Sequence, residues 1–143
     1  MKPENSKAIL GGIVGTIAMT LMMMFLAPMM TGAPMDIAAM LGGMLGGWTV
    51  GMIAHVILGV IIFPLIYVLV IYHFVPGPPI VRGLVYGTLL WLAAVVVVMP
   101  IAGAGVLMSN VGGMVAVIAA LVGHLVYGGL LGVIAGYGPT RQT

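Results

Sequence analysis

Two histidines are the residues of this sequence best able to do chemistry. His55 and His124 each lie well inside a long run of uncharged, mostly apolar residues. Ionisable side chains in such runs are usually buried in the protein and often functional. A neutral imidazole carries one N–H donor and one bare nitrogen, so each histidine can hydrogen-bond to a neighbouring helix or ligate a metal.

Three interpretations of this pair stay open. Each imidazole can donate a hydrogen bond across a close helix contact, to a proline-freed carbonyl or to the hydroxyl of Thr16, Thr20 or Thr88. Alternatively, His55 and His124 ligate the iron of one haem b from opposite sides, as cofactor sites between bundle helices do. A quinone or metal site is the third interpretation.

Glycines accompany both histidines at four-residue steps. Gly51 and Gly59 flank His55, and Gly128 follows His124. Such stripes of small residues let membrane helices approach closely. The same three glycines would also leave space for a haem macrocycle, although the haem propionates would need basic residues that the outer side lacks.

Methionine is frequent, with 14 residues, and gathers around the predicted outer face. Thioether sulfurs bind Cu(I), and Met40 and Met44 have the regular short spacing of copper motifs. Methionine also fills irregular gaps beside glycine. A small channel or Cu(I)-handling membrane protein is therefore a further hypothesis.

The charge content decides the class of protein. Of 143 residues, 63% are hydrophobic, four are Lys or Arg and two are Asp or Glu. So few charges exclude a water-soluble domain, a disordered chain and a nucleic-acid-binding protein. The chain is predicted to be an integral membrane protein in contact with the lipid bilayer. Its two carboxylates, Glu4 and Asp36, lie outside the apolar runs, so we expect no enzyme.

The uncharged runs predict an all-α membrane protein with a single domain, residues 1–143. The four transmembrane helices fall at about residues 8–30, 48–72, 82–106 and 111–137. Residues 34–47 have a helical apolar pattern and predict a short interfacial helix on the outer face, with Asp36 near its start.

Orientation follows from the basic residues. With four spans, Lys2, Lys7, Arg82 and Arg141 fall on one side of the membrane. The positive-inside rule then places both termini in the cytoplasm and the protein in the inner (plasma) membrane.

The two halves of the chain resemble each other. Gly15-Thr16 recurs as Gly87-Thr88, and Pro28 recurs as Pro100, 72 residues further on. His55 and His124 correspond at an offset of 69. These matches predict two pseudo-repeated helical hairpins related by an axis along the membrane normal.

Several short motifs also point to a family. They are Ala54-His55 with Gly59, Arg82-Gly83, Met99-Pro100 with Gly103 and Gly105, His124 with Tyr127-Gly128, and Gly136-Tyr137-Gly138. With these motifs the sequence resembles a family of small, uncharacterised bacterial four-helix integral membrane proteins, a domain of unknown function. The resemblance implies the fold and topology and brings no catalytic or binding residues.

The function that the sequence favours is that of an accessory or scaffold subunit. It would act through glycine-rich helix packing, as a homo-oligomer or within a larger membrane complex. The bis-histidine haem b electron carrier is the alternative.

Overall fold

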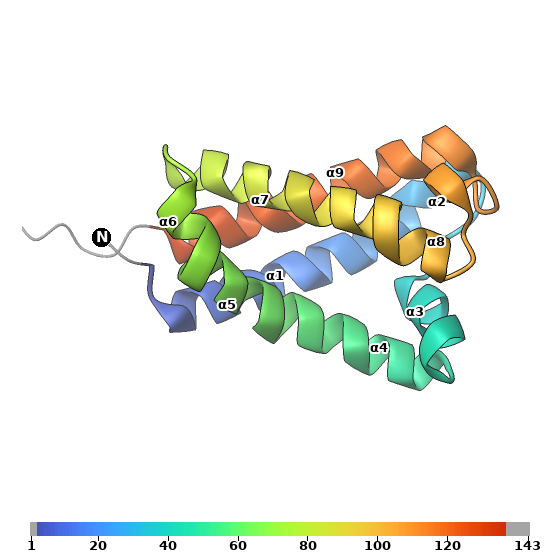
Figure 1. Cartoon of the computed structure of the whole chain (residues 1–143), viewed down its shortest axis with the longest axis horizontal. Coiled ribbons are helices and arrows are strands. Elements are labelled where there is room, and N and C mark those ends of the chain that lie inside the picture. Colours follow the sequence, from blue (N-terminus) through green and yellow to red (C-terminus); the bar gives the residue numbers. More distant parts are fainter. Residues whose placement is uncertain (1–2, 137–143) are drawn as a thin grey trace, which may run out of the picture.

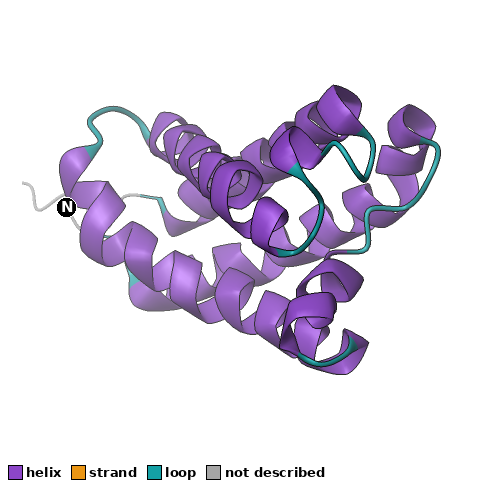
Figure 2. Ribbon diagram, turned by 45° about the vertical axis from the view of Figure 1, so that its right-hand side comes forward, coloured by secondary structure: helices purple, strands orange, loops and turns teal. Residues whose placement is uncertain are grey.

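The computed structural model describes residues 3–136, and these residues form helices and no strand. Four helices are long and apolar enough to cross a membrane: Asn5–Thr31, Trp48–Phe74, Pro79–Ile101 and Gly113–Ala135 (Figures 1 and 2). The predicted all-α membrane fold with four spans is confirmed.

Three of the four spans contain π-helical segments, denoted η. Span one consists of α1 (Asn5–Leu21), η1 (Met22–Leu26) and α2 (Ala27–Thr31). Span two consists of α4 (Trp48–Ile57), η2 (Leu58–Ile62), α5 (Phe63–Ile66), η3 (Tyr67–Ile71) and α6 (Tyr72–Phe74). Span three consists of α7 (Pro79–Ala93), η4 (Ala94–Val98) and α8 (Met99–Ile101), whereas span four is the continuous helix α9 (Gly113–Ala135).

The third helix is displaced from its predicted position. It begins at Pro79 rather than at residue 82, because proline suits the first turn of a helix, where its missing N–H would be unpaired anyway. It ends at Ile101 rather than at residue 106, and Gly103 and Gly105 then adopt positive φ angles. A short 3₁₀ turn, η5 (Val106–Met108), leads to the fourth helix. Residue 137, the predicted end of that helix, lies outside the described residues.

Prolines explain two of the π-helical segments and their partners. A π-helical turn pairs residue i with the carbonyl of residue i−5, and proline has no N–H to give. Pro28 therefore leaves the Met23 carbonyl free, and this oxygen accepts the Met35 N–H at 3.0 Å. Pro64 leaves the Gly59 carbonyl free, and it accepts the Tyr127 hydroxyl at 2.5 Å. Each freed carbonyl thus becomes a tertiary contact.

The spans pack in the order three, four, one, two. Helix α9 contacts α7 on one side and α1 on the other, and α1 also contacts η2 and α5 of span two (Figure 1). The α7–α9 contact is close because a Cβ added at Gly83 would meet the Gly128 carbonyl, and one added at Gly128 would meet the Gly83 carbonyl. Spans two and four are therefore diagonal to each other.

Residues 34–47 form a helix, α3 (Ile37–Leu45), which packs against α4. Asp36 caps it: one carboxylate oxygen accepts the Ala39 N–H at 2.9 Å, and the other accepts the Trp48 Nε1–H at 3.0 Å. The carboxylate thereby satisfies an otherwise unpaired N–H of the first turn. The position of α3 at a membrane interface stays a prediction.

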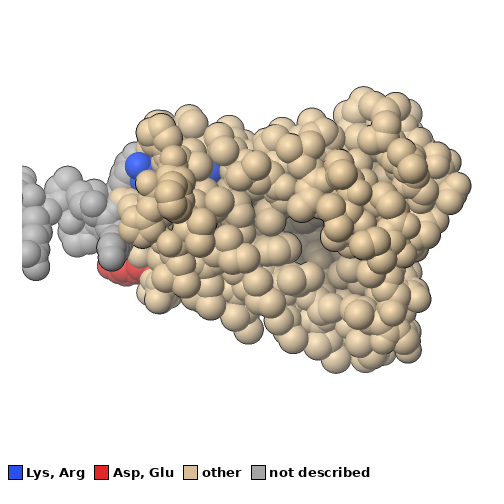
Figure 3. Space-filling view, in the orientation of Figure 1, with Lys and Arg blue, Asp and Glu red and all other residues tan. Residues whose placement is uncertain are grey.

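The two ends of the bundle differ in charge. Lys7 lies in the first turn of α1 and Arg82 in the first turn of α7, and both helices begin at the same end of the bundle (Figure 1). We call it the basic end; blue Lys and Arg atoms mark it in Figure 3. Helix α3 lies at the opposite end, which we call the α3 end (Figure 1). Lys2 and Arg141, which the sequence assigns to the basic side, lie outside the described residues.

The internal repeat of two helical hairpins stays a prediction.

Candidate intramembrane binding site

Spans two and three contact each other near the basic end. The Arg82 guanidinium lies over the Tyr72 ring, 4.3 Å from its centroid. The Tyr86 hydroxyl donates to the Phe63 carbonyl at 2.9 Å, and the Tyr86 and Tyr67 ring centroids are 5.7 Å apart. These aromatic and cationic side chains hold the two spans together there.

Toward the α3 end the same two spans separate and leave a cleft. Its volume is about 320 Å³, and its walls come from α1, α3 and spans two, three and four. Figure 3 shows a hollow in this surface, between the side of α4 and the side of α7 and α8. Most of the lining is aliphatic, aromatic or thioether side chain, including Leu58, Leu90 and Val98. His55 and His124 both line it, so the structure brings the two histidines to one site.

The His55 ring is held by a threonine of span one. Its Nε2 lies 2.9 Å from the Thr20 hydroxyl oxygen, which in turn lies 2.7 Å from the Thr16 carbonyl. The hydroxyl has one proton and gives it to that carbonyl, so the His55 Nε2–H is the donor to Thr20. The Nδ1 of neutral His55 is then the bare nitrogen. A cross-helix bond from histidine to threonine is one of the three interpretations that the sequence leaves open, and Thr20 is the acceptor.

The His124 ring bonds within its own helix instead. Its Nδ1 lies 2.7 Å from the Ala120 carbonyl oxygen. A carbonyl can only accept, so Nδ1 carries the proton and Nε2 is bare. The expected cross-helix bond is therefore absent at this histidine, and Thr88 donates to the Leu84 carbonyl rather than to an imidazole.

Thr16 is a polar residue of the cleft that the sequence introduced only as an acceptor for histidine. Its side chain is 6% exposed and lines the cleft. Its hydroxyl has no hydrogen-bond partner among residues 3–136. Buried hydroxyl groups are normally paired, and this one is instead packed against Gly59 of span two.

The glycines predicted to leave room for a cofactor contact neighbouring helices. A Cβ added at Gly51 would meet the Ala38 carbonyl, and one added at Gly59 would meet the Thr16 hydroxyl. Gly128 faces Gly83. Gly59 also lines the cleft between spans two and three, whereas Gly51 and Gly128 do not.

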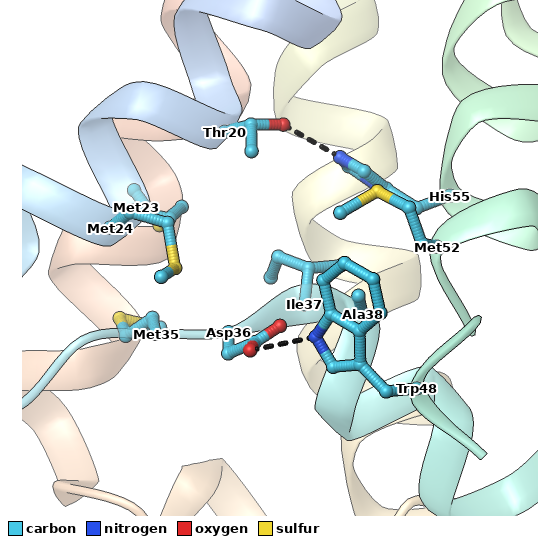
Figure 4. A pocket seen from close by; sticks show the side chains of 10 residues that line it. All are labelled: Thr20, Met23, Met24, Met35, Asp36, Ile37, Ala38, Trp48, Met52 and His55. Atoms are coloured by element: carbon cyan, nitrogen blue, oxygen red, sulfur yellow. Dashed lines mark hydrogen bonds between the residues drawn. The ribbon is translucent and has the colours of Figure 1, made fainter.

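A smaller pocket of about 80 Å³ lies at the α3 end, beside the cleft (Figure 4). Met23, Met24 and Met35 line one side of it, while Met52 lies beside His55 on the other. These methionines meet because the Met35 N–H bonds to the π-helical turn of span one, which no sequence spacing reveals.

The methionines chosen from the sequence as weak copper ligands lie elsewhere. Met44 is exposed, and neither it nor Met40 lines the pocket of Figure 4. Residues 3–136 contain no group of three or more His, Cys, Asp or Glu side chains that could hold a metal ion. A copper site built on Met40 and Met44 stays a prediction.

Comparison with protein families identifies the family of this chain. Residues 3–143 match the model of a family of unknown function, DUF6789. The chain belongs to this family. The resemblance to an uncharacterised family is thus confirmed. No curated protein and no solved structure matches the chain, so the geometry of the cleft is the guide to its function.

Proposed function

We propose that this protein is a small accessory protein of the inner membrane that binds a bilayer-soluble, largely apolar ligand between spans two and three. It carries out no chemical reaction. The observation that supports this is the combination of one apolar cleft with four polar side chains, Thr16, His55, His124 and Tyr127. Ligand sites typically combine apolar walls with a few placed polar groups in this way.

The volume and setting of the cleft support an apolar occupant. Side chains that line an unfilled space lose van der Waals partners, so a ligand that fills about 320 Å³ regains these contacts. Spans two and three carry many exposed aliphatic side chains, so their outer faces suit the lipid bilayer. A ligand that is dissolved in the bilayer would reach the cleft without crossing water.

Filling the cleft tests the proposal. In Ala94→Phe a ring occupies the space that Ala94 lines, whereas Val96→Phe adds a ring at a position of the same π-helical turn that is 63% exposed. We expect native mass spectrometry of the wild type, released from a mild detergent, to show a bound apolar molecule. Val96→Phe should keep it and Ala94→Phe should lose it. Equal occupancy in all three proteins, or none in the wild type, would refute the proposal.

The proposed orientation has both termini in the cytoplasm, and the joint position of Lys7 and Arg82 supports it. The chain has no cysteine, so a single introduced thiol can be labelled without background. In intact cells a membrane-impermeant maleimide should label Ser109→Cys and leave Lys7→Cys unlabelled. Labelling of Lys7→Cys and not of Ser109→Cys would show that the orientation is the opposite of the one proposed.

Haem b is the second candidate, because His55 and His124 line the same cleft and the bare Nε2 of His124 suits an axial ligand. To ligate iron through Nε2, His55 would have to give up its bond to Thr20. The visible spectrum of protein made in haem-supplied cells decides between the candidates. A Soret band that disappears in both His55→Ala and His124→Ala would establish haem, and a colourless preparation would exclude it.

Association into a homo-oligomer or a larger membrane complex belongs to the same proposal. A ligand-binding accessory subunit would act there through close helix packing of the kind that α7 and α9 make. Chemical cross-linking in native membranes, followed by mass measurement, tests this part.

A further inference from the structure

We infer that the cleft selects a ligand whose polar end is a hydroxyl group, such as a long-chain phenol, over one whose polar end only accepts hydrogen bonds. The inference rests on the proposed binding function and names the chemistry of the ligand. It follows from the hydrogen bonds that fix the two imidazoles.

His124 presents an acceptor to the cleft. Its proton is on Nδ1, where the Ala120 carbonyl accepts it at 2.7 Å. Moving the proton to Nε2, so that the ring presents an N–H to a ligand, would remove this bond and leave the Ala120 carbonyl facing the bare Nδ1. The ring therefore offers Nε2, a lone pair that only a donor can satisfy.

His55 adds a second acceptor. Its proton is on Nε2, directed at Thr20, and the Thr20 hydroxyl proton is directed at the Thr16 carbonyl. The Thr16 carbonyl at the end of this chain can only accept, so Thr20 donates to it and His55 donates to Thr20. Nδ1 of His55 is left with its lone pair.

Thr16 lies in the wall of the cleft, but its hydroxyl is buried against Gly59 and does not face a ligand there. A ligand hydroxyl can donate its proton to a bare imidazole nitrogen. A ligand carbonyl or ether has no proton to donate, so it leaves buried polar groups unpaired.

The walls of the cleft determine which tail and which charge the ligand can have. Its walls carry Leu58, Phe63, Leu90 and Val98, and no charged side chain lies among the described lining residues. A headgroup with formal charge would be unpaired there. The ligand class is therefore a neutral alcohol or phenol with an apolar tail, which includes lipid-soluble hydroquinones but not their quinone forms.

A competition between matched compounds tests this inference. The full-length protein in lipid nanodiscs is given 4-dodecylphenol and its methyl ether at equal amounts, and native mass spectrometry counts each bound species. Because both compounds are in the same bilayer, differences in partitioning largely cancel. We expect the phenol to be preferred about tenfold, which corresponds to one net hydrogen bond. In His124→Phe the preference should fall to near one, while Val96→Phe should keep the wild-type ratio.

A second pair, 1-dodecanol and its methyl ether, identifies the kind of hydroxyl. Preference for the alcohol over its ether in either pair supports the inference, and the stronger pair tells whether the hydroxyl is aromatic or aliphatic. Equal binding of alcohol and ether in both pairs, blocked by Ala94→Phe, would overturn the inference and leave the binding function intact. Failure of all four compounds to bind would overturn both.

The proton positions can be measured directly and do not depend on any ligand. In protein labelled with ¹⁵N at histidine, the ring nitrogen shifts should show the proton of His124 on Nδ1 and that of His55 on Nε2. A proton on Nε2 of His124 would make it a donor toward the cleft and would overturn the inference.

Discussion

The α7–α9 contact and the cleft between spans two and three are both rich in small residues, yet the first is closed and the second is open. In the closed contact, glycine faces glycine: Gly83 lies against Gly128 and Gly132. Across the cleft, Ala93 and Ala94 of span three face larger side chains such as Leu58 and His55. Small residues thus close a helix contact only when both helices supply them at the same depth.

Aromatic rings account for the rest of this difference. Tyr67 of span two and Tyr86 of span three lie side by side near the basic end, and the Tyr86 hydroxyl bonds to the backbone of span two. Two rings of this size, tilted 44° to each other, keep the helix axes further apart than facing glycines do. The cleft begins where these rings end.

Adding a methyl group to the α7–α9 contact should lower the free energy of unfolding more than any other change considered below. In Gly128→Ala the new Cβ meets the backbone of Gly83 and Gly87, which cannot move without displacing α7. We expect the free energy of unfolding, measured by SDS titration in mixed micelles, to fall by about 3 kcal/mol. Gly43→Ala is the control, because nothing lies within 4 Å of its Cβ and alanine favours helix, so it should be neutral or stabilising.

Removing one hydroxyl that bridges spans two and four should have the next largest effect. Tyr127→Phe leaves the Gly59 carbonyl, already freed by Pro64, without the donor that it has at 2.5 Å. The expected loss is about 2 kcal/mol, the cost of an unpaired buried carbonyl. Tyr72→Phe keeps the ring beneath Arg82 and should change the unfolding free energy little. Equal losses in both variants would contradict this role of Tyr127.

Changing the His55–Thr20 pair should have a smaller effect on stability. Thr20→Val removes an acceptor at a half-buried site, and we expect a loss of about 1 kcal/mol. The more specific readout is the ring of His55, whose proton should no longer be confined to Nε2 in the ¹⁵N spectrum. An unchanged His55 spectrum would show that Thr20 does not fix the proton, while His124 serves as the internal control.

Filling the open region should have the smallest effect. Ala94→Phe places a ring in existing space, so we expect the free energy of unfolding to change by less than about 1 kcal/mol, in contrast to the single methyl group at Gly128. A loss as large as that of Gly128→Ala would mean that the cleft is closed in the membrane. The comparison between the two regions would then fail.

The sequence predicted the four spans, and it left a hydrogen bond from histidine to threonine open as one of three interpretations. These features depend on charge-free runs and on a few polar residues, whose partners are limited in an apolar environment. The neighbours of each helix could not be predicted in the same way. In a membrane protein the lipid-facing and core-facing sides are both apolar, so hydrophobic periodicity does not mark the buried side.

The cleft depends on backbone features that the sequence hardly indicates. The π-helical turns before Pro28 and Pro64 turn the following side chains, and the Met35 N–H that bonds to Met23 brings α3 against the end of the site. The burial of the Thr16 hydroxyl against Gly59 depends on how α1 packs on span two, which the sequence does not show. Only the proline positions indicated these contacts in the sequence, since each proline frees a backbone carbonyl that needs another donor.

The joining of spans two and three near one end has a mechanical consequence. From Phe63 to Trp48 span two rises by about 22 Å, at about 1.5 Å per residue. A tilt of about 5° at the Phe63–Tyr86 contact therefore changes the gap at the far end by about 2 Å, which is half the thickness of an aromatic ring with its contacts. The tyrosines at this contact therefore set the width of the cleft at its far end.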